Sequence, residues 1–138
     1  MAASDLIDRI ACTDVMLTYV KGVDERDMAL YRTCFAVDVQ AFHAGNAYDG
    51  VDAWLDFIET ALQRFGPTQH MLGPPLVSVQ GDTAHCRTDL QAVHYLKDAP
   101  GTTLTLWATY ETDMRRIGGA WKITRHEVVR RGSRTQSD

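Results

Sequence analysis

The sequence predicts an α+β domain in which three N-terminal helices pack on a curved, mainly antiparallel β-sheet that forms a conical barrel around an internal pocket. Two observations indicate this class. Three segments before residue 66 carry apolar residues at helical spacing, whereas the segments after residue 75 alternate apolar and polar residues between turns. No linker, repeat or low-complexity stretch divides the 138 residues, so we expect one domain over residues 1–130 and a disordered tail over residues 131–138.

The first two helices are expected close together at the N-terminus. Residues 6–20 show the amphipathic spacing of a helix, and Gly22 breaks it. Asp24 or Asp27 is then available as the N-cap of a short second helix that ends near Phe35.

A strand and a third helix complete the N-terminal half. Residues 37–42 alternate apolar and polar side chains, which predicts a strand, and residues 46–50 read as a turn. Residues 51–65 form one apolar stripe at helical spacing, and Gly66 and Pro67 end that helix.

The C-terminal half is expected to be a meander of long antiparallel strands. The predicted strands cover residues 76–79, 83–95, 102–115 and 120–129. Glycine-containing turns separate them, which is typical of hairpins.

Composition narrows the class of function. A net charge of −4 argues against a general nucleic-acid binder, and no apolar run approaches the roughly 20 residues that a membrane span needs. The cysteines, Cys12, Cys34 and Cys86, are odd in number and far apart, which favours reduced thiols in a cytoplasmic protein. We therefore expect neither a nucleic-acid nor a membrane partner.

Three polar residues form the candidate catalytic cluster. His70 ends the tripeptide Thr68-Gln69-His70, which we place at the junction of the third helix and the first long strand. Strand parity puts His94 on the apolar, inward face of residues 83–95, whereas His85 points the other way. Asp24 follows the first helix and is the candidate carboxylate.

Each of these residues also has a structural interpretation. A lone inward histidine is often a hydrogen-bonded core residue, and Asp24 could simply cap the second helix. His70 could be a loop residue that binds a carbonyl group.

The chemistry that remains is acid–base catalysis. The chain has no Gly-x-Ser-x-Gly elbow, glycine-rich phosphate loop or HExxH motif. A carboxylate that orients an imidazole leaves the other ring nitrogen free to remove a proton from carbon. We expect no metal and no cofactor.

Several motifs occur in the order found in one known family. They are the segments Phe35-Ala36-Val37-Asp38-Val39, Thr68-Gln69-His70, Gly81-Asp82-Thr83-Ala84 and Gly119-Ala120-Trp121-Lys122-Ile123. Over nearly its whole length the chain resembles a SnoaL-like domain of the nuclear-transport-factor-2-like superfamily. Within that superfamily it is most similar to scytalone dehydratase, with hexachlorocyclohexane dehydrochlorinase as a relative.

The resemblance implies catalytic roles for three residues. The dehydratase aspartate corresponds to Asp24, its Thr-Gln-His histidine to His70, and its second histidine to His94. The dehydrochlorinase shares the first two of these positions.

Other family positions depart from the pattern. The two tyrosines with which the dehydratase polarises a ketone fall on Val23 and His43, and the dehydrochlorinase lysine and arginine fall on Tyr19 and, approximately, His126. Tyr19 and Tyr48 are candidate replacements, although aromatic core packing is the commoner role for such residues.

We therefore expect a cofactor-independent lyase of the dehydratase type that acts on a small hydrophobic or cyclic substrate. His70 would remove the proton, His94 would protonate the leaving hydroxyl, and Tyr19 or His43 would bond the substrate oxygen. The expected substrate-binding residues are Tyr19, His43, Tyr48, Trp54, Met71 and His126. The alternatives are a ketosteroid-isomerase-like isomerase and a non-catalytic small-molecule binding module.

An assembly is also expected. The outward face that carries His85, Arg87, Asp89 and Gln91 is polar yet belongs to a long strand, which favours packing against another subunit. We expect a homo-oligomer, a trimer before a dimer.

Overall fold

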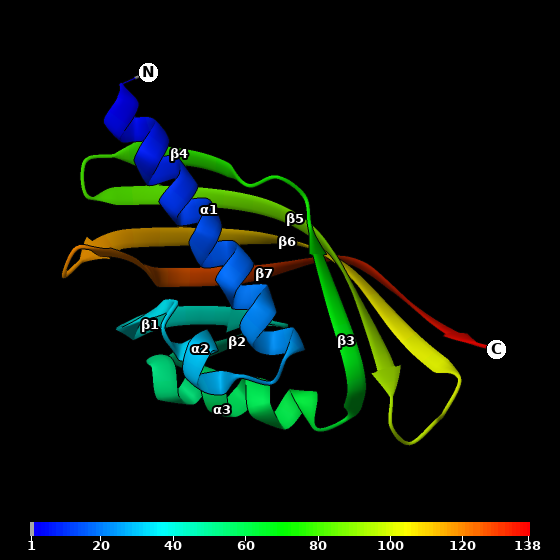
Figure 1. Cartoon of the computed structure of the whole chain (residues 1–138). Coiled ribbons are helices and arrows are strands. Elements are labelled where there is room, and N and C mark those ends of the chain that lie inside the picture. The colour runs from blue at the N-terminus through cyan, green and yellow to red at the C-terminus, as the bar shows by residue number, and fades with distance from the viewer. Residues whose placement is uncertain (1) are drawn as a thin grey trace.

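The computed structural model describes residues 2–138, and Figure 1 shows the arrangement of their helices and strands. The helices are α1 (Ala3–Asp24), α2 (Met28–Arg32) and α3 (Val51–Leu62). The strands are β1 (Phe35–His43), β2 (Asn46–Asp49), β3 (Phe65–Leu72), β4 (Leu76–Gln80), β5 (Thr83–Leu96), β6 (Thr102–Ile117) and β7 (Ala120–Ser137). No helix in this part of the chain is long and apolar enough to cross a membrane.

The strands form one curved mixed sheet in the order β2-β1-β7-β6-β5-β3, and β4 also pairs with β5. All pairings are antiparallel except that of β1 with β7. The predicted α+β class is confirmed. The sheet is open rather than closed into a barrel, because β2 and β3 do not pair and α3 contacts both of them instead.

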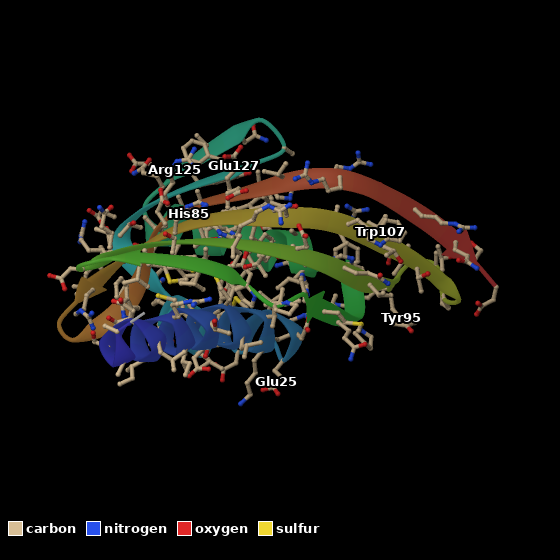
Figure 2. All side chains as sticks on the ribbon, turned by 90° about the horizontal axis from the view of Figure 1, so that it is seen from above. Glu25, His85, Tyr95, Trp107, Arg125 and Glu127 are labelled. Atoms are coloured by element: carbon tan, nitrogen blue, oxygen red, sulfur yellow. The ribbon has the colours of Figure 1, made fainter. Side chains whose placement is uncertain are left out.

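The helices cover the concave face of this sheet (Figures 1 and 2). Helix α1 lies across the strands and buries Cys12, Met16, Tyr19 and Val23. Trp54 of α3 is fully buried, and its indole N–H donates to the Tyr31 hydroxyl at 2.9 Å. Because α1 and α3 bury these side chains against the sheet, the C-terminal end of α1 has a fixed position relative to the strands.

The structure assigns different roles to Asp24 and Asp27, which lie on either side of the turn between α1 and α2. Asp27 is the N-cap of α2, and its carboxylate accepts from the backbone N–H of Leu30 at 3.0 Å. Asp24, the last residue of α1, is therefore free for other contacts.

The structure differs from the sequence prediction around His70. Helix α3 ends at Leu62, and Phe65–Leu72 is a strand, where a longer helix and a loop were expected. Pro67 is tolerated there because β3 lies at the edge of the sheet and pairs only with β5. Residues 46–49, expected as a turn, form the short strand β2.

The C-terminus also differs from the prediction. Residues 131–137 continue β7 instead of forming a disordered tail, because β6 begins at Thr102 and offers them a partner. Pairing jumps from Ala108–Arg130 to Trp107–Gly132, so Arg131 is the extra residue of a β-bulge. This bulge lets Arg130 and Ser133, three residues apart, both line the concave side.

Candidate active site

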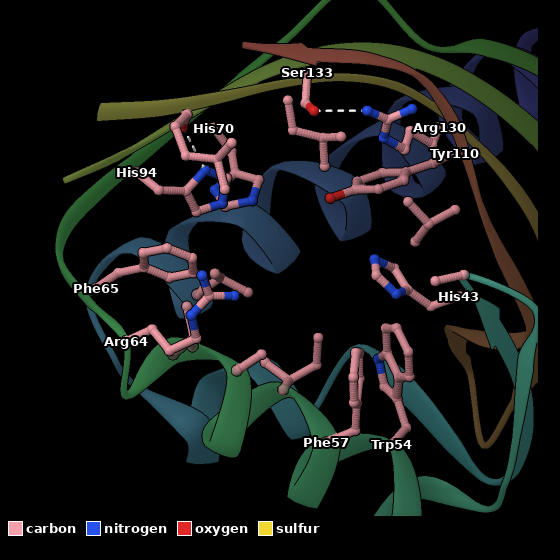
Figure 3. A pocket seen from close by; sticks show the side chains of 18 of the residues that line it. His43, Trp54, Phe57, Arg64, Phe65, His70, His94, Tyr110, Arg130 and Ser133 are labelled. Carbon is pink, nitrogen blue, oxygen red and sulfur yellow. Dashed lines mark hydrogen bonds between the residues drawn. The ribbon is translucent and has the colours of Figure 1, made fainter. Parts of the chain in front are cut away.

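The concave side of the sheet encloses a pocket of about 500 Å³ (Figure 3). Its walls are mainly apolar and aromatic, and they include Trp54, Phe57, Phe65, Leu104, Leu106 and Val128. Polar residues from five strands and one connection reach the same space, namely His43, Arg64, His70, His94, Tyr110 and Arg130. Its volume and its few polar groups suit a small, largely apolar ligand.

Asp24 holds His70 in a fixed orientation at this pocket. The Asp24 Oδ1 atom accepts from Nδ1 of the His70 ring at 2.7 Å, and Oδ2 accepts from the His70 backbone N–H at 2.8 Å. Only 9% of the His70 side chain and 20% of the Asp24 side chain are exposed. Because a carboxylate only accepts here, Nδ1 carries a proton, and in the neutral imidazole the lone pair then lies on Nε2.

A second layer of contacts fixes Asp24 itself. The Thr68 hydroxyl donates to Asp24 Oδ1 at 2.9 Å and accepts from the Arg26 guanidinium at 2.9 Å. Arg26 also donates to the backbone oxygens of Val23 and Gly66, at 2.8 and 2.6 Å. Arg26 thereby ties the end of α1 to the start of β3.

The balance of burial and hydrogen bonding keeps Asp24 ionised. Burial alone raises the pKa of this carboxyl, but the hydrogen bonds from the ring and backbone of His70 and from Thr68 outweigh burial, so its pKa lies below the usual 3.8. Asp24 is therefore a carboxylate at neutral pH.

His94 lies next to His70 on the inward face of β5, where strand parity placed it. The centroids of the two rings are 5.7 Å apart, and the ring of Phe65 packs 4.6 Å from that of His94. Nδ1 of His94 donates to the Leu104 carbonyl at 3.0 Å. Burial lowers the pKa of His94 below 6.5, and the neighbouring His70 acts in the same direction, so His94 is neutral with an unprotonated Nε2.

Another wall of the pocket carries His43 and Tyr110 (Figure 3). The His43 ring packs 5.2 Å from that of Phe57, and burial lowers the pKa of His43. Burial raises the pKa of Tyr110 well above 10, so its hydroxyl keeps its proton. Sequence reasoning missed Tyr110, although it shares strand parity with the inward residues Leu104 and Leu106.

Tyr19 lines the pocket, but its hydroxyl already has a partner. It lies 3.0 Å from Nε2 of His126, and Nδ1 of His126 lies 3.0 Å from the Thr112 hydroxyl. His126 is fully buried, and burial, aided by His43, lowers its pKa to about 3. His126 is thus a neutral core histidine behind the pocket wall rather than a lining residue.

Two further expected binding residues lie outside the pocket lining. Met71 is 61% exposed, because β3 alternates its side chains and sends Met71 to the face opposite His70. Tyr48 stacks on Phe57, with ring centroids 4.5 Å apart, and so supports the wall from behind. Trp54, by contrast, lines the pocket as expected.

The described residues contain no group of three or more His, Cys, Asp or Glu side chains arranged to hold a metal ion. The polar groups at the pocket are histidines, arginines, hydroxyls and the amide of Asn46. Proton transfer and hydrogen bonding are the chemistry that they supply directly.

Comparison with known proteins places the chain in a family. Residues 4–127 match the model of the SnoaL-like domain. The chain belongs to the SnoaL-like domain family. No curated protein matches its sequence.

Solved structures resemble this SnoaL-like domain along most of their length. A proposed scytalone dehydratase from Novosphingobium aromaticivorans superposes with a TM-score of 0.89 at 20% identity, covering 97% of this chain and 91% of that one. A type 2 hexachlorocyclohexane dehydrochlorinase, LinA, gives 0.87 at 19% identity, with coverage of 96% and 91%. A proposed aromatic ring hydroxylase from N. aromaticivorans gives 0.85 at 24% identity, with coverage of 96% and 94%. At these identities the SnoaL-like domain shares the fold with them.

Proposed function

We propose that this protein is a cofactor-independent lyase of the dehydratase type, which eliminates water or a similar leaving group from a small cyclic substrate. The observation that carries the proposal is the 2.7 Å hydrogen bond between Asp24 and Nδ1 of His70. It leaves the lone pair of His70 Nε2 as a base at the pocket, and it stabilises the imidazolium that forms when that base takes a proton. The folds of a dehydratase-like protein and a dehydrochlorinase support the same class.

The elimination needs only one proton carrier. His70 Nε2 takes a proton from a carbon next to a carbonyl or another activating group, and the C–H electron pair becomes the new double bond as the C–O bond breaks. The Nε2–H of the imidazolium then protonates the departing hydroxyl, which leaves as water. The base returns to its starting state, and no oxidant or reductant is consumed.

His94 has a different role here from the one that the sequence suggested. A neutral His94 whose Nδ1–H is bonded to Leu104 has no proton on Nε2 to give to a leaving group. Its Nε2 instead accepts a hydrogen bond from a substrate hydroxyl and so holds that group beside His70. His94 thus orients the substrate.

Tyr110 supplies the hydrogen bond to the oxygen on which negative charge develops. Its hydroxyl keeps its proton and belongs to the pocket lining, where it neighbours the Tyr19 hydroxyl that His126 engages. A donor in a cavity with apolar walls stabilises a developing charge more strongly than one in water. His43, with its neutral ring, is the second donor available on this wall.

The experiment that tests this function is a turnover screen by mass spectrometry on cyclic hydroxyketones, halogenated cyclohexanes and enones. Wild type is compared with His70→Ala and with His85→Ala, a histidine on the outer sheet face that contacts Asp113 and Glu111. We expect wild type and His85→Ala to remove water or hydrogen halide, and folded His70→Ala to lose turnover. Wild-type rates in folded His70→Ala would exclude the mechanism.

Isomerisation is the second candidate, because one base that both takes and returns a proton also moves a double bond. The absence of a resting proton donor on His94 Nε2 fits that reaction equally well. Product analysis separates the two, since an isomer keeps the mass of the substrate. Binding without any chemical change would instead support a small-molecule binding module.

A further inference from the structure

The pocket of this protein is positively charged. Its lining contains the guanidinium groups of Arg64 and Arg130 and no aspartate or glutamate, whereas the lining histidines His43 and His94 are neutral. The nearby carboxylate of Asp24 is already bonded to His70 and Thr68. Arg64 and Arg130 are both exposed at the edge of the pocket, so solvent screens their charge, but no acidic group of the lining competes with an anionic ligand for them.

Among residues 2–138, the two arginines also lack acidic partners. The ion pairs among residues 2–138 involve other arginines, such as Arg32, Arg87, Arg116 and Arg125. Arg64 lies over the ring of Phe65, with its Cζ atom 5.3 Å from the ring centroid. Arg130 donates to the Ser133 hydroxyl at 2.6 Å.

Arg130 is the better fixed of the two. The bulge at Arg131 puts Arg130 and Ser133 on the same face of β7, and the Ser133 hydroxyl holds one guanidinium nitrogen, as the dashed line in Figure 3 shows. The planar guanidinium can bind both oxygens of a carboxylate at once, which a lysine cannot. A guanidinium held in place loses less conformational entropy when it binds.

Strand register sets the separation between this arginine and the base. His70, Ala92, Leu106 and Ser133 occupy one row across β3, β5, β6 and β7, and Arg130 pairs with Ala108, two positions further along β6. Strands β3 and β7 are therefore three strand spacings apart, roughly 14 Å at the backbone. The side chains of His70 and Arg130 both line the pocket, so a ligand that contacts both must span several strands of the sheet.

We propose that the ligand of this pocket is a cyclic carboxylic acid, whose carboxylate pairs with Arg130 while its ring lies against the aromatic wall and beside His70. This inference rests on the proposed function for the role of His70, but the binding of the acid itself does not depend on catalysis. It defines the substrate class as ring acids rather than neutral rings.

The test is a binding measurement with matched pairs of ligands. Calorimetry compares 4-hydroxybenzoate with 4-hydroxybenzamide, and cyclohexanecarboxylate with its amide, on wild type, Arg130→Gln, Arg64→Gln and Arg134→Gln. Arg134 is an exposed arginine on the same strand that does not line the pocket, so it is the matched control. Circular dichroism and thermal unfolding establish that each variant is folded.

We expect wild type and Arg134→Gln to bind each acid at least about tenfold more tightly than its amide, and Arg130→Gln to lose about 10- to 100-fold in affinity for the acids alone, a larger loss than Arg64→Gln shows. Equal binding of acid and amide by wild type, no binding of any acid at millimolar concentration, or a preference for acids that survives Arg130→Gln but not Arg64→Gln would overturn the proposal.

The two proposals fail in different ways. If wild type dehydrates neutral rings and shows no preference for acids, the proposed lyase activity is supported and the proposed acid site is contradicted. If wild type binds acids through Arg130 but turns over neither acids nor neutral rings, the proposed acid site is supported and the proposed lyase activity is contradicted.

Discussion

Both oxygens of the Asp24 carboxylate bind His70, one through the ring Nδ1–H at 2.7 Å and the other through the backbone N–H at 2.8 Å. One side chain thus fixes the tautomer of the ring and the position of the strand that carries it. The two residues are 46 positions apart, so the contact exists only when the end of α1 and strand β3 are correctly packed. The base is therefore assembled by the tertiary fold.

Replacing the carboxylate should disable the base without unfolding the chain. In Asp24→Asn, the side-chain amide can donate to Nδ1 of His70, which favours the tautomer with its proton on Nε2. We expect turnover to fall on the order of 10²- to 10⁴-fold, as measured by steady-state kinetics on the substrate found in the screen.

The control for this variant is Asp27→Asn. Asp27 caps α2, and asparagine is an equally good N-cap, so turnover and melting temperature should stay near those of wild type. Full activity in Asp24→Asn would show that the carboxylate does not act through His70.

The buried His126 should make the protein less stable as the pH falls below neutral. Burial holds its pKa to about 3 in the folded state, against 6.5 when unfolded, so its contribution is complete above pH 6.5 and is lost as the pH falls toward 3. This residue alone should remove about 2 kcal/mol of unfolding free energy between pH 7 and pH 5. His43 and His94, whose pKa values are also lowered, act in the same direction.

Urea unfolding at pH 7 and pH 5 measures this effect, with His126→Gln as the comparison. Glutamine keeps a donor and an acceptor for Tyr19 and Thr112 but does not titrate, so its loss of stability should be smaller. Carboxyl groups with lowered pKa values, such as Asp24, keep their contribution to stability above about pH 4 and lose it only below that, whereas His85, whose pKa is raised by Asp113, contributes fully below 6.5 and loses its contribution as the pH rises above that value. If wild type and His126→Gln lost the same unfolding free energy between pH 7 and pH 5, groups other than His126 would cause the loss.

Tyr110→Phe tests the hydrogen bond to the substrate oxygen. The change removes a single hydroxyl from the pocket wall and keeps the ring that packs 4.8 Å from His126. If this donor stabilises charge in the transition state, kcat should fall by about 10²- to 10³-fold while KM changes little. Tyr48→Phe, on a ring outside the pocket lining, should leave kcat unchanged.

The outer face of the sheet should bind other copies of the chain. Figure 2 shows His85, Trp107, Arg125 and Glu127 on that face, where Trp107 remains 39% exposed. We expect a homo-oligomer, a trimer before a dimer, by light scattering at micromolar concentration. Trp107→Glu should lower the mass, whereas the same change at Val37, an exposed apolar residue of β1, should not. A wild-type mass of one chain would contradict the prediction.

The alternation of apolar and polar residues in the sequence predicted correctly which way the histidines of β5 point. Alternation along β5 placed His94 inward and His85 outward, since neighbouring side chains of a strand point to opposite faces. The same reasoning could not choose between Asp24 and Asp27 as the cap of α2, because both positions are chemically suitable. The long-range hydrogen bonds from Thr68 and His70 to Asp24 distinguish the two aspartates, and no local pattern predicts them.

The mistaken parts of the prediction also have physical causes. Gly66 and Pro67 were read as breakers, but an edge strand tolerates a proline because one of its sides needs no partner. The polar residues 131–138 lack the alternation of apolar and polar side chains that predicts a strand. They extend β7 nevertheless, because their backbone pairs with the backbone of β6. Arg130 and Ser133 were missed for this reason.

The extra residue in β7 affects how this chain should be aligned with its relatives. Position 131 has no partner of its own on β6, so a relative with a regular strand lacks a counterpart for Arg131. An alignment without a gap there would assign Gly132, which has no side chain, to the place that Ser133 occupies. Ligand specificities inferred from such an alignment would then be drawn from the wrong face of the strand.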